Sequence, residues 1–183
     1  MATKSLETLW TVSEPGENAL VVAASASLLL LAGAHAFETF AGMAPCPLCL
    51  DQREVHWAAV AFAGIGWIVN RINPSPLARI ATISVGSLIY VTGFVIASYH
   101  AGVEYGLWPG PASCASGAGA APSAEDVMKA LSGAAKSVPC DEAPWRFLGI
   151  SMAGYNALIS GAIAAFLARN AIDLRRGREP RMP

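Results

Sequence analysis

The sequence has few charged residues and only four cysteines. Charged residues make up 14% of its 183 positions and apolar residues 54%, whereas a soluble chain is about one quarter charged. This shortage argues against an ordinary soluble domain and predicts a membrane protein. The sequence also has no internal repeat and no room for a second globular domain beside its apolar runs.

The apolar residues gather in four runs, which are Ala19 to Phe37, Val55 to Val69, Ile80 to Tyr99 and Phe147 to Leu167. A helix needs about 20 residues to cross the hydrocarbon layer, so the second run is short and must recruit the residues from Leu48 onward. We therefore predict an all-α membrane protein, a single domain (1–183) forming a four-transmembrane-helix antiparallel bundle. The expected spans are at about residues 19–37, 49–69, 80–99 and 147–167.

The basic residues predict how this bundle lies in the membrane. One side carries eight of them, Lys4, Arg71, Arg79, Arg169, Arg175, Arg176, Arg178 and Arg181, and the other side carries four over a longer length. The positive-inside rule then places both termini and the tail 168–183 in the cytoplasm. The loops 38–48 and 100–146, with all four cysteines, would face the periplasm of a bacterium, an oxidising compartment. No cleavable signal peptide is evident, because the amino terminus is acidic and the first run is long enough to remain as an anchor.

The longer loop should contain one short amphipathic helix between Ser123 and Gly133. Ser123 with Asp126 resembles a capping box, and Val127, Met128 and Leu131 form one apolar face. Such a helix would lie on the bilayer surface.

The cysteines form two pairs, a C-x-x-C motif at Cys46 and Cys49 and a second pair at Cys114 and Cys140. A C-x-x-C pair readily closes into a reducible disulfide. Pro47 suits the first position of a helix, so Cys49 would lie at a helix N-terminus, where the dipole favours a thiolate.

Two further side chains share the predicted helix face of Cys49. Arg53 and His56 follow it by four and seven residues, which at about 100° per residue leaves both within roughly 40° of its direction. A cysteine, a cation and an imidazole would therefore meet at the membrane boundary and favour thiol redox chemistry.

These motifs together resemble the bacterial DsbB family, quinone-dependent oxidases that regenerate the periplasmic dithiol oxidase DsbA. The resemblance rests on Cys46-Pro47-Leu48-Cys49, Arg53, Tyr99-His100, the loop cysteine pair and Trp145-Arg146-Phe147-Leu148-Gly149, and it extends from about residue 19 to 167. It implies an enzyme, a protein disulfide oxidoreductase of the bacterial inner membrane. It also implies a quinone (ubiquinone or menaquinone), a DsbA-like thioredoxin-fold partner, and the respiratory chain as acceptor of the quinol.

The resemblance assigns a role to each site residue. Cys49 matches the cysteine whose thiolate contacts the quinone, and Cys46 matches its disulfide partner. Arg53 and His100 match positions at the quinone pocket. Cys114 matches the cysteine attacked by reduced DsbA, and Cys140 the cysteine that resolves the mixed disulfide. The four catalytic cysteines and three quinone contacts, Cys49, Arg53 and His100, are therefore the expected site.

Several alternatives remain open from the residues alone. A specialised DsbB paralogue would carry the same motifs, and a vitamin K epoxide reductase-like oxidase has a similar bundle, although its loop pair precedes the C-x-x-C. A zinc site or inert structural disulfides are further options, but zinc favours two tight pairs and a structural disulfide needs no neighbouring cation. Four cysteines allow three pairings, and His35, Glu38 and His56 have no assigned role. The arginine-rich tail is explained by membrane topology rather than by nucleic-acid binding.

Overall fold

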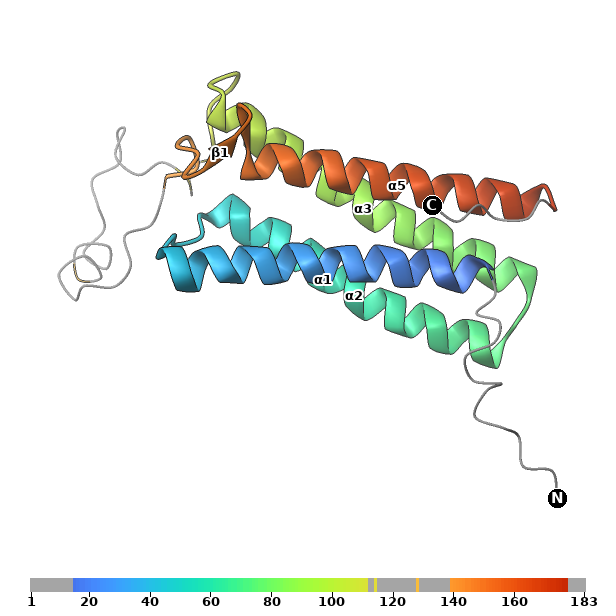
Figure 1. Ribbon diagram of the computed structural model, residues 1–183. Coiled ribbons are helices and arrows are strands. Elements are labelled where there is room, and N and C mark those ends of the chain that lie inside the picture. Colours follow the sequence, from blue (N-terminus) through green and yellow to red (C-terminus); the bar gives the residue numbers. More distant parts are fainter. Residues whose placement is uncertain (1–14, 112–113, 115–127, 129–138, 178–183) are drawn as a thin grey trace.

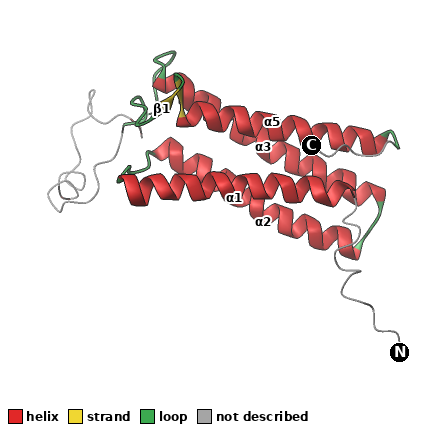
Figure 2. Cartoon of the chain, viewed as in Figure 1, coloured by secondary structure: helices red, strands yellow, loops and turns green. Residues whose placement is uncertain are grey.

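The computed structural model describes residues 15–111, 114, 128 and 139–177, and these residues build a bundle of long helices (Figure 1). The helices are α1 (Pro15–Ala41), α2 (Pro47–Ile72), α3 (Pro76–Glu104) and α5 (Met152–Arg175). A two-residue hairpin, β1 (Arg146–Phe147) and β2 (Ile150–Ser151), precedes α5. Figure 2 shows that almost all the rest of the described chain is connecting loop.

Four helices are long and apolar enough to cross a membrane, at Asn18–Ala41, Pro47–Ile72, Pro76–Glu104 and Met152–Arg175. They run side by side and alternate in direction, as Figure 1 shows. Many large apolar side chains point out of the bundle, among them Leu29, Ile65 and Leu88. A face of this kind suits lipid rather than water, and the predicted four-helix membrane fold is confirmed.

Side-chain caps fix where three of the helices begin. Cys46 is the N-cap of α2 and Ser75 that of α3, each followed by proline at the first helical turn. Ser151 caps α5 by accepting a hydrogen bond from the Gly154 backbone N–H at 3.1 Å. Proline is well tolerated at the first helical position, because the N–H it lacks would have no partner in the helix. The predicted recruitment of the residues before Val55 into α2 is thereby confirmed.

Small residues allow the four helices to approach closely around a narrow core. The buried centre contains alanines from α1, α2 and α5 together with four large side chains, Leu20, Ile83, Tyr90 and Leu167. A Cβ added at Gly86 of α3 would lie 3.0 Å from a Leu20 methyl group of α1. Small residues take this role between membrane helices because they let backbones pack against each other.

The last helix begins later than predicted from the sequence, at Met152 instead of residue 147, because the hairpin precedes it. Leu148 and Gly149 both have positive φ values, 50° and 81°, which is the geometry of a tight two-residue hairpin turn. The chain therefore reverses before α5 begins at Met152. The Tyr105 hydroxyl ties this turn to the end of α3 by donating to the Gly149 carbonyl at 2.9 Å.

The amphipathic helix expected between Ser123 and Gly133 lies outside the described residues, apart from Met128, and stays a prediction.

Candidate functional site

One end of the bundle brings all four cysteines together. The end of α1, the start of α2, the end of α3 and the start of α5 meet there, at the left of Figure 1. Cys46, Cys114 and Cys140 lie in one buried cluster with Leu48 and Val103, and Cys49 packs against it. Residues 46 and 140 are far apart in the sequence, so the fold creates this arrangement.

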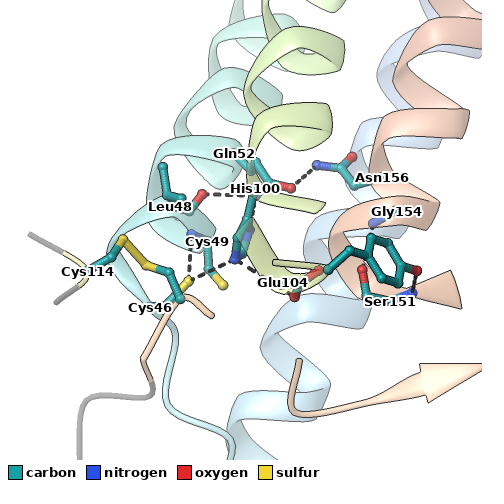
Figure 3. Close-up of polar contacts among 12 residues, drawn as sticks. Cys46, Leu48, Cys49, Gln52, His100, Glu104, Cys114, Ser151, Gly154 and Asn156 are labelled. Atoms are coloured by element: carbon teal, nitrogen blue, oxygen red, sulfur yellow. Dashed lines mark hydrogen bonds and ion pairs between the residues drawn. A yellow bond between two sulfur atoms is a disulfide. The ribbon is translucent and has the colours of Figure 1, made fainter. Parts of the chain in front are cut away.

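The two cysteine pairs differ in bonding. Cys114 and Cys140 form a disulfide with a Cα–Cα distance of 5.2 Å, and Cys46 and Cys49 are free thiols. Figure 3 shows this disulfide beside Cys46. The two pairs are therefore neighbours, as an exchange of disulfides between them requires.

The first turn of α2 holds Cys46 and Cys49 in different surroundings. Cys46 is the N-cap, and its sulfur accepts a hydrogen bond from the Cys49 backbone N–H at 3.2 Å. A hydrogen bond with the Cys49 side chain, together with burial, raises the pKa of the Cys46 thiol. Cys46 is thus the member of the pair that keeps its proton. Cys49 lies at the positive end of the helix dipole.

Gln52 determines which nitrogen of His100 carries the proton. Its Nε2 donates to the Leu48 carbonyl at 3.0 Å and lies 2.7 Å from His100 Nδ1 (Figure 3). A carbonyl oxygen can only accept, so the amide nitrogen must be on this side and Nδ1 must be the acceptor. The neutral ring then carries its proton on Nε2, which faces the Cys46 sulfur at 3.6 Å. Nε2 of His100 can therefore donate to the Cys46 sulfur, and His100 also makes a hydrogen bond with the Cys140 backbone.

Glu104 is a buried carboxylate one turn beyond His100. Its Oε1 lies 3.8 Å from His100 Nε2, and its Oε2 has no hydrogen-bond partner among the described residues. Arg146 lies close by, donating from Nη2 to the backbone carbonyl of Glu104 at 3.0 Å. A buried carboxylate oxygen without a partner is costly in a purely structural role, which makes Glu104 a functional candidate.

A cavity of about 440 Å³ opens beside Cys49 between α1, α2 and α5. Most of its wall is apolar, including Leu29, Leu30, Phe37, Met43 and Ile159. It is also lined by the thiol Cys49 and by polar residues, among them Gln52, Arg53, His56, His100, Glu104, Tyr155 and Asn156. Apolar walls with a few convergent polar groups are typical of a small-molecule site.

Aromatic rings pack against one another in the wall of the cavity. Trp145 packs against Phe37 of α1, Phe147 of the hairpin and Tyr155 of α5, with ring centroids 5.7 to 6.1 Å apart. These contacts join the hairpin, α1 and α5 in one part of the cavity wall.

Arg53 is held in the cavity wall by two partners from α1. Its Nη1 donates to Glu38 Oε2 at 2.5 Å, and its Nη2 donates to the Ala34 carbonyl at 3.2 Å. The Arg53 side chain is 15% exposed and that of Glu38 is 38% exposed. The ion pair orients a guanidinium that still lines the cavity.

The structure brings the sequence-predicted residues into one site. Cys49, Arg53 and His100 all line the cavity, and Cys46 lies between Cys49 and the loop disulfide. Of the three residues without an assigned role, Glu38 pairs with Arg53, and His56 is buried in the cavity wall. The third, His35, has a half-exposed side chain 3.7 Å from Glu38.

Sequence reasoning missed Gln52, Glu104 and Asn156. One signal could have found them, because polar residues inside membrane-spanning segments are rare and usually functional.

The ligand atoms of Cys46, Cys49 and His100 lie within 4.8 Å of one another and could hold a metal ion. Structural zinc sites use four protein ligands, and this group offers three.

Comparison with known proteins gives a consistent result. The family model described as "Disulfide bond formation protein DsbB" matches residues 16–169. The chain is 30% identical over 148 residues to the Disulfide bond formation protein B of Pasteurella multocida (strain Pm70), covering 79% of each chain. No solved structure matches it.

Proposed function

The chain belongs to the DsbB family of disulfide bond formation proteins, and from this membership we propose that it reoxidises a DsbA-like thioredoxin-fold partner and passes the electrons to a membrane quinone. Family membership and four spanning helices make it a multi-pass bacterial membrane protein that forms disulfide bonds. The quinone, the partner and the roles of individual residues are the proposed part.

The position of the C-x-x-C pair is the observation that carries this proposal. Cys46 contacts the loop disulfide cluster, and Cys49 lines the cavity. One reducible pair therefore touches a second disulfide on one side and a small-molecule site on the other. Two inert structural disulfides would have no need for this arrangement.

The proposed exchange begins at the loop pair. A thiolate of the partner attacks Cys114, a new disulfide forms between them, and the Cys114–Cys140 bond breaks with Cys140 leaving as a thiolate. The second thiol of the partner then displaces Cys114, so the partner leaves oxidised and the loop pair is reduced. In the reverse direction, Cys140 would resolve the mixed disulfide at Cys114.

Electrons then move to the C-x-x-C pair by a second exchange. The loop dithiol reduces a Cys46–Cys49 disulfide and becomes a disulfide again. The pairing in the structure, with Cys114 bonded to Cys140 and two free thiols at Cys46 and Cys49, corresponds to the stage after this step. Thiol exchange moves disulfides without creating them, so an electron acceptor is required.

The residues of the cavity fit a quinone. Its apolar wall suits an isoprenoid tail and the faces of a flat ring, and polar groups that could bind the ring oxygens line it together with Cys49. A bound quinone would accept two electrons and two protons. Cys49 would contact it, Arg53 would stabilise negative charge beside it, and His100 would hold a proton at Nε2 next to Cys46.

The proposed orientation follows from the same function. We expect the cysteine end to face the periplasm of the bacterial inner membrane, with both termini in the cytoplasm, because the basic residues lie mostly at the opposite end. The partner would then reach Cys114 from the periplasm.

Stopped-flow mixing with a purified reduced DsbA-like protein and ubiquinone or menaquinone tests the proposal. Quinol should form with one equivalent of oxidised partner, and Cys49→Ser should stop quinol formation while Cys114 still forms a mixed disulfide with the partner. Partner oxidation that proceeds equally well without a quinone would refute the proposed acceptor.

A further inference from the structure

Hydrogen-bonded side chains continue from Gln52 toward the centre of the bundle. Asn156 of α5 donates from Nδ2 to Gln52 Oε1 at 2.7 Å, and its Oδ1 lies 2.8 Å from His56 Nε2. The Leu48 carbonyl fixes the orientation of the Gln52 amide, which in turn fixes that of Asn156. An amide oxygen therefore faces His56, so Nε2 of His56 must carry a proton to bond with it.

The other nitrogen of the His56 ring faces a second series of hydroxyl groups. Nδ1 lies 2.9 Å from Ser27 Oγ, and Ser27 Oγ lies 2.7 Å from the Tyr90 hydroxyl. Tyr90 in turn donates its single proton to the Ala23 carbonyl at 2.6 Å. Ser27 must then donate to Tyr90, and its oxygen is left to accept a proton from His56 Nδ1.

The His56 ring lies between the two hydrogen-bonded series, one running through Gln52 and Asn156 and the other through Tyr90 and Ser27. Each of its two short ring contacts, to Asn156 Oδ1 and to Ser27 Oγ, needs a proton on the ring nitrogen, while Asn156 Oδ1 also accepts from Ser160 at 3.2 Å. A neutral imidazole has only one N–H and a protonated one has two. With neutral His56, one contact of the network lacks a proton. A second proton on the ring would complete every bond without moving any partner.

The surroundings decide when the ring would take that proton. Burial disfavours a charged ring, and Ser27, Tyr90 and Asn156 contribute no group that ionises near neutral pH. The charged or titratable groups that the described residues add to the cavity wall beside His56 are Cys49, Arg53, His100, Glu104 and Tyr155. Negative charge arriving in the cavity would therefore favour protonation of His56.

We propose that His56 is a proton-holding site in the cavity wall, arranged by Ser27 and Asn156 to accept a second proton during reduction of the quinone. The inference rests on the proposed function in one respect, because it takes a quinone as the group that finally receives the proton. Oxidation of the Cys46–Cys49 dithiol releases two electrons and two protons, and quinol formation uses both of each. His56 would hold one of these protons at Nδ1 until it leaves on the quinol, so the balance is unchanged.

The histidine content of the chain allows a direct test. Only three histidines occur, His35, His56 and His100, so ¹⁵N-histidine labelling gives two ring-nitrogen signals from each of three residues. The His56 signals are identified as those absent from His56→Gln. The His56 titration can be followed in the full-length protein without turnover.

Tyr90→Phe gives the sharpest outcome. Without the Tyr90 hydroxyl, Ser27 is released to donate to Nδ1, and neutral His56 then has every bond satisfied. The midpoint of the His56 titration should fall by about one pH unit, as expected for one hydrogen bond. Tyr99→Phe is the matched control on the same helix and should leave the midpoint unchanged, because Tyr99 bonds the Pro109 carbonyl instead.

Ser27→Ala provides a second variant in case Tyr90→Phe does not fold. It removes the acceptor for the second proton and should also lower the midpoint. An unchanged midpoint in the folded variants, or a ring that never binds a second proton, would overturn the proposal.

Turnover separates this proposal from the proposed function. In Tyr90→Phe, the high-pH fall in quinol formation should begin about one pH unit lower, with an unchanged KM for the partner. A shifted titration in a protein that reduces no quinone would preserve the proton site and refute the quinone function. Normal quinone reduction with an unshifted His56 titration would support the quinone function and refute the proton site.

Discussion

Arg53→Ala tests whether the guanidinium acts on the ligand of the cavity. A hydrogen bond from a charged donor contributes about 1.5–3 kcal/mol, and about 1.4 kcal/mol corresponds to a factor of ten. Loss of one such bond from Arg53 should therefore raise the KM for quinone about 10- to 100-fold. Because Glu38 is 38% exposed and can be hydrated, we expect only a small loss of stability. Quinone-dependent kinetics and thermal unfolding measure the two effects separately.

Two further variants control this experiment. Arg53→Lys keeps the charge and loses the planar fork, so its KM should be intermediate. Glu38→Gln removes the ion-pair partner and leaves the guanidinium, so its KM should stay within about threefold of the unmodified protein. An equal rise in the KM for quinone in Arg53→Ala and Glu38→Gln would indicate that Arg53 acts through its ion pair with Glu38 and not on the quinone. Unchanged quinone kinetics in a folded Arg53→Ala protein would refute the role of Arg53.

Three other predictions concern the loop pair, the topology and the packing. Cys140→Ser should trap a DsbA-like protein with an oxidised active site in a mixed disulfide with Cys114, visible on a non-reducing gel, whereas an inert disulfide gives no adduct. A topology reporter fused after Asn73 should indicate the cytoplasm, and a periplasmic signal there would show that the predicted orientation is wrong. Gly102→Ala should lower the thermal midpoint, because its Cβ would overlap the Trp108 ring and overpacking costs about 1–3 kcal/mol; an unchanged midpoint would contradict this packing.

The architecture could be predicted because it depends on local features of the sequence. Apolar run length indicated the four spans, and Pro47 marked the start of α2 at the residue the structure shows. The spacing of Cys49, Arg53 and His56 predicted a shared face, and all three line the cavity. The late start of α5 was missed because Phe147 is apolar, while the turn at Leu148 and Gly149 depends on an anchor to Tyr105.

The polar interior could not be predicted because it depends on how the helices are rotated about their axes. Run length leaves open which face of α5 meets α2, and this choice brings Asn156 to both Gln52 and His56. The burial of Glu104 likewise requires α3 to continue one turn past His100 beneath Arg146. The ion pair of Glu38 with Arg53 depends on the approach of α1 to α2.

The start of α2 explains how one cysteine pair can serve two neighbours. Cys46 is the N-cap and has an extended backbone, with φ −77° and ψ 165°, whereas Cys49 is already inside the first turn. The two residues therefore present their sulfur atoms to different surroundings, Cys46 to the loop disulfide and Cys49 to the cavity. At the same time, the Cys49 backbone N–H bonds the Cys46 sulfur at 3.2 Å, which keeps the pair close enough to close. A helix beginning one residue later would lose this cap, so the position of Pro47 links the fold directly to the proposed electron path.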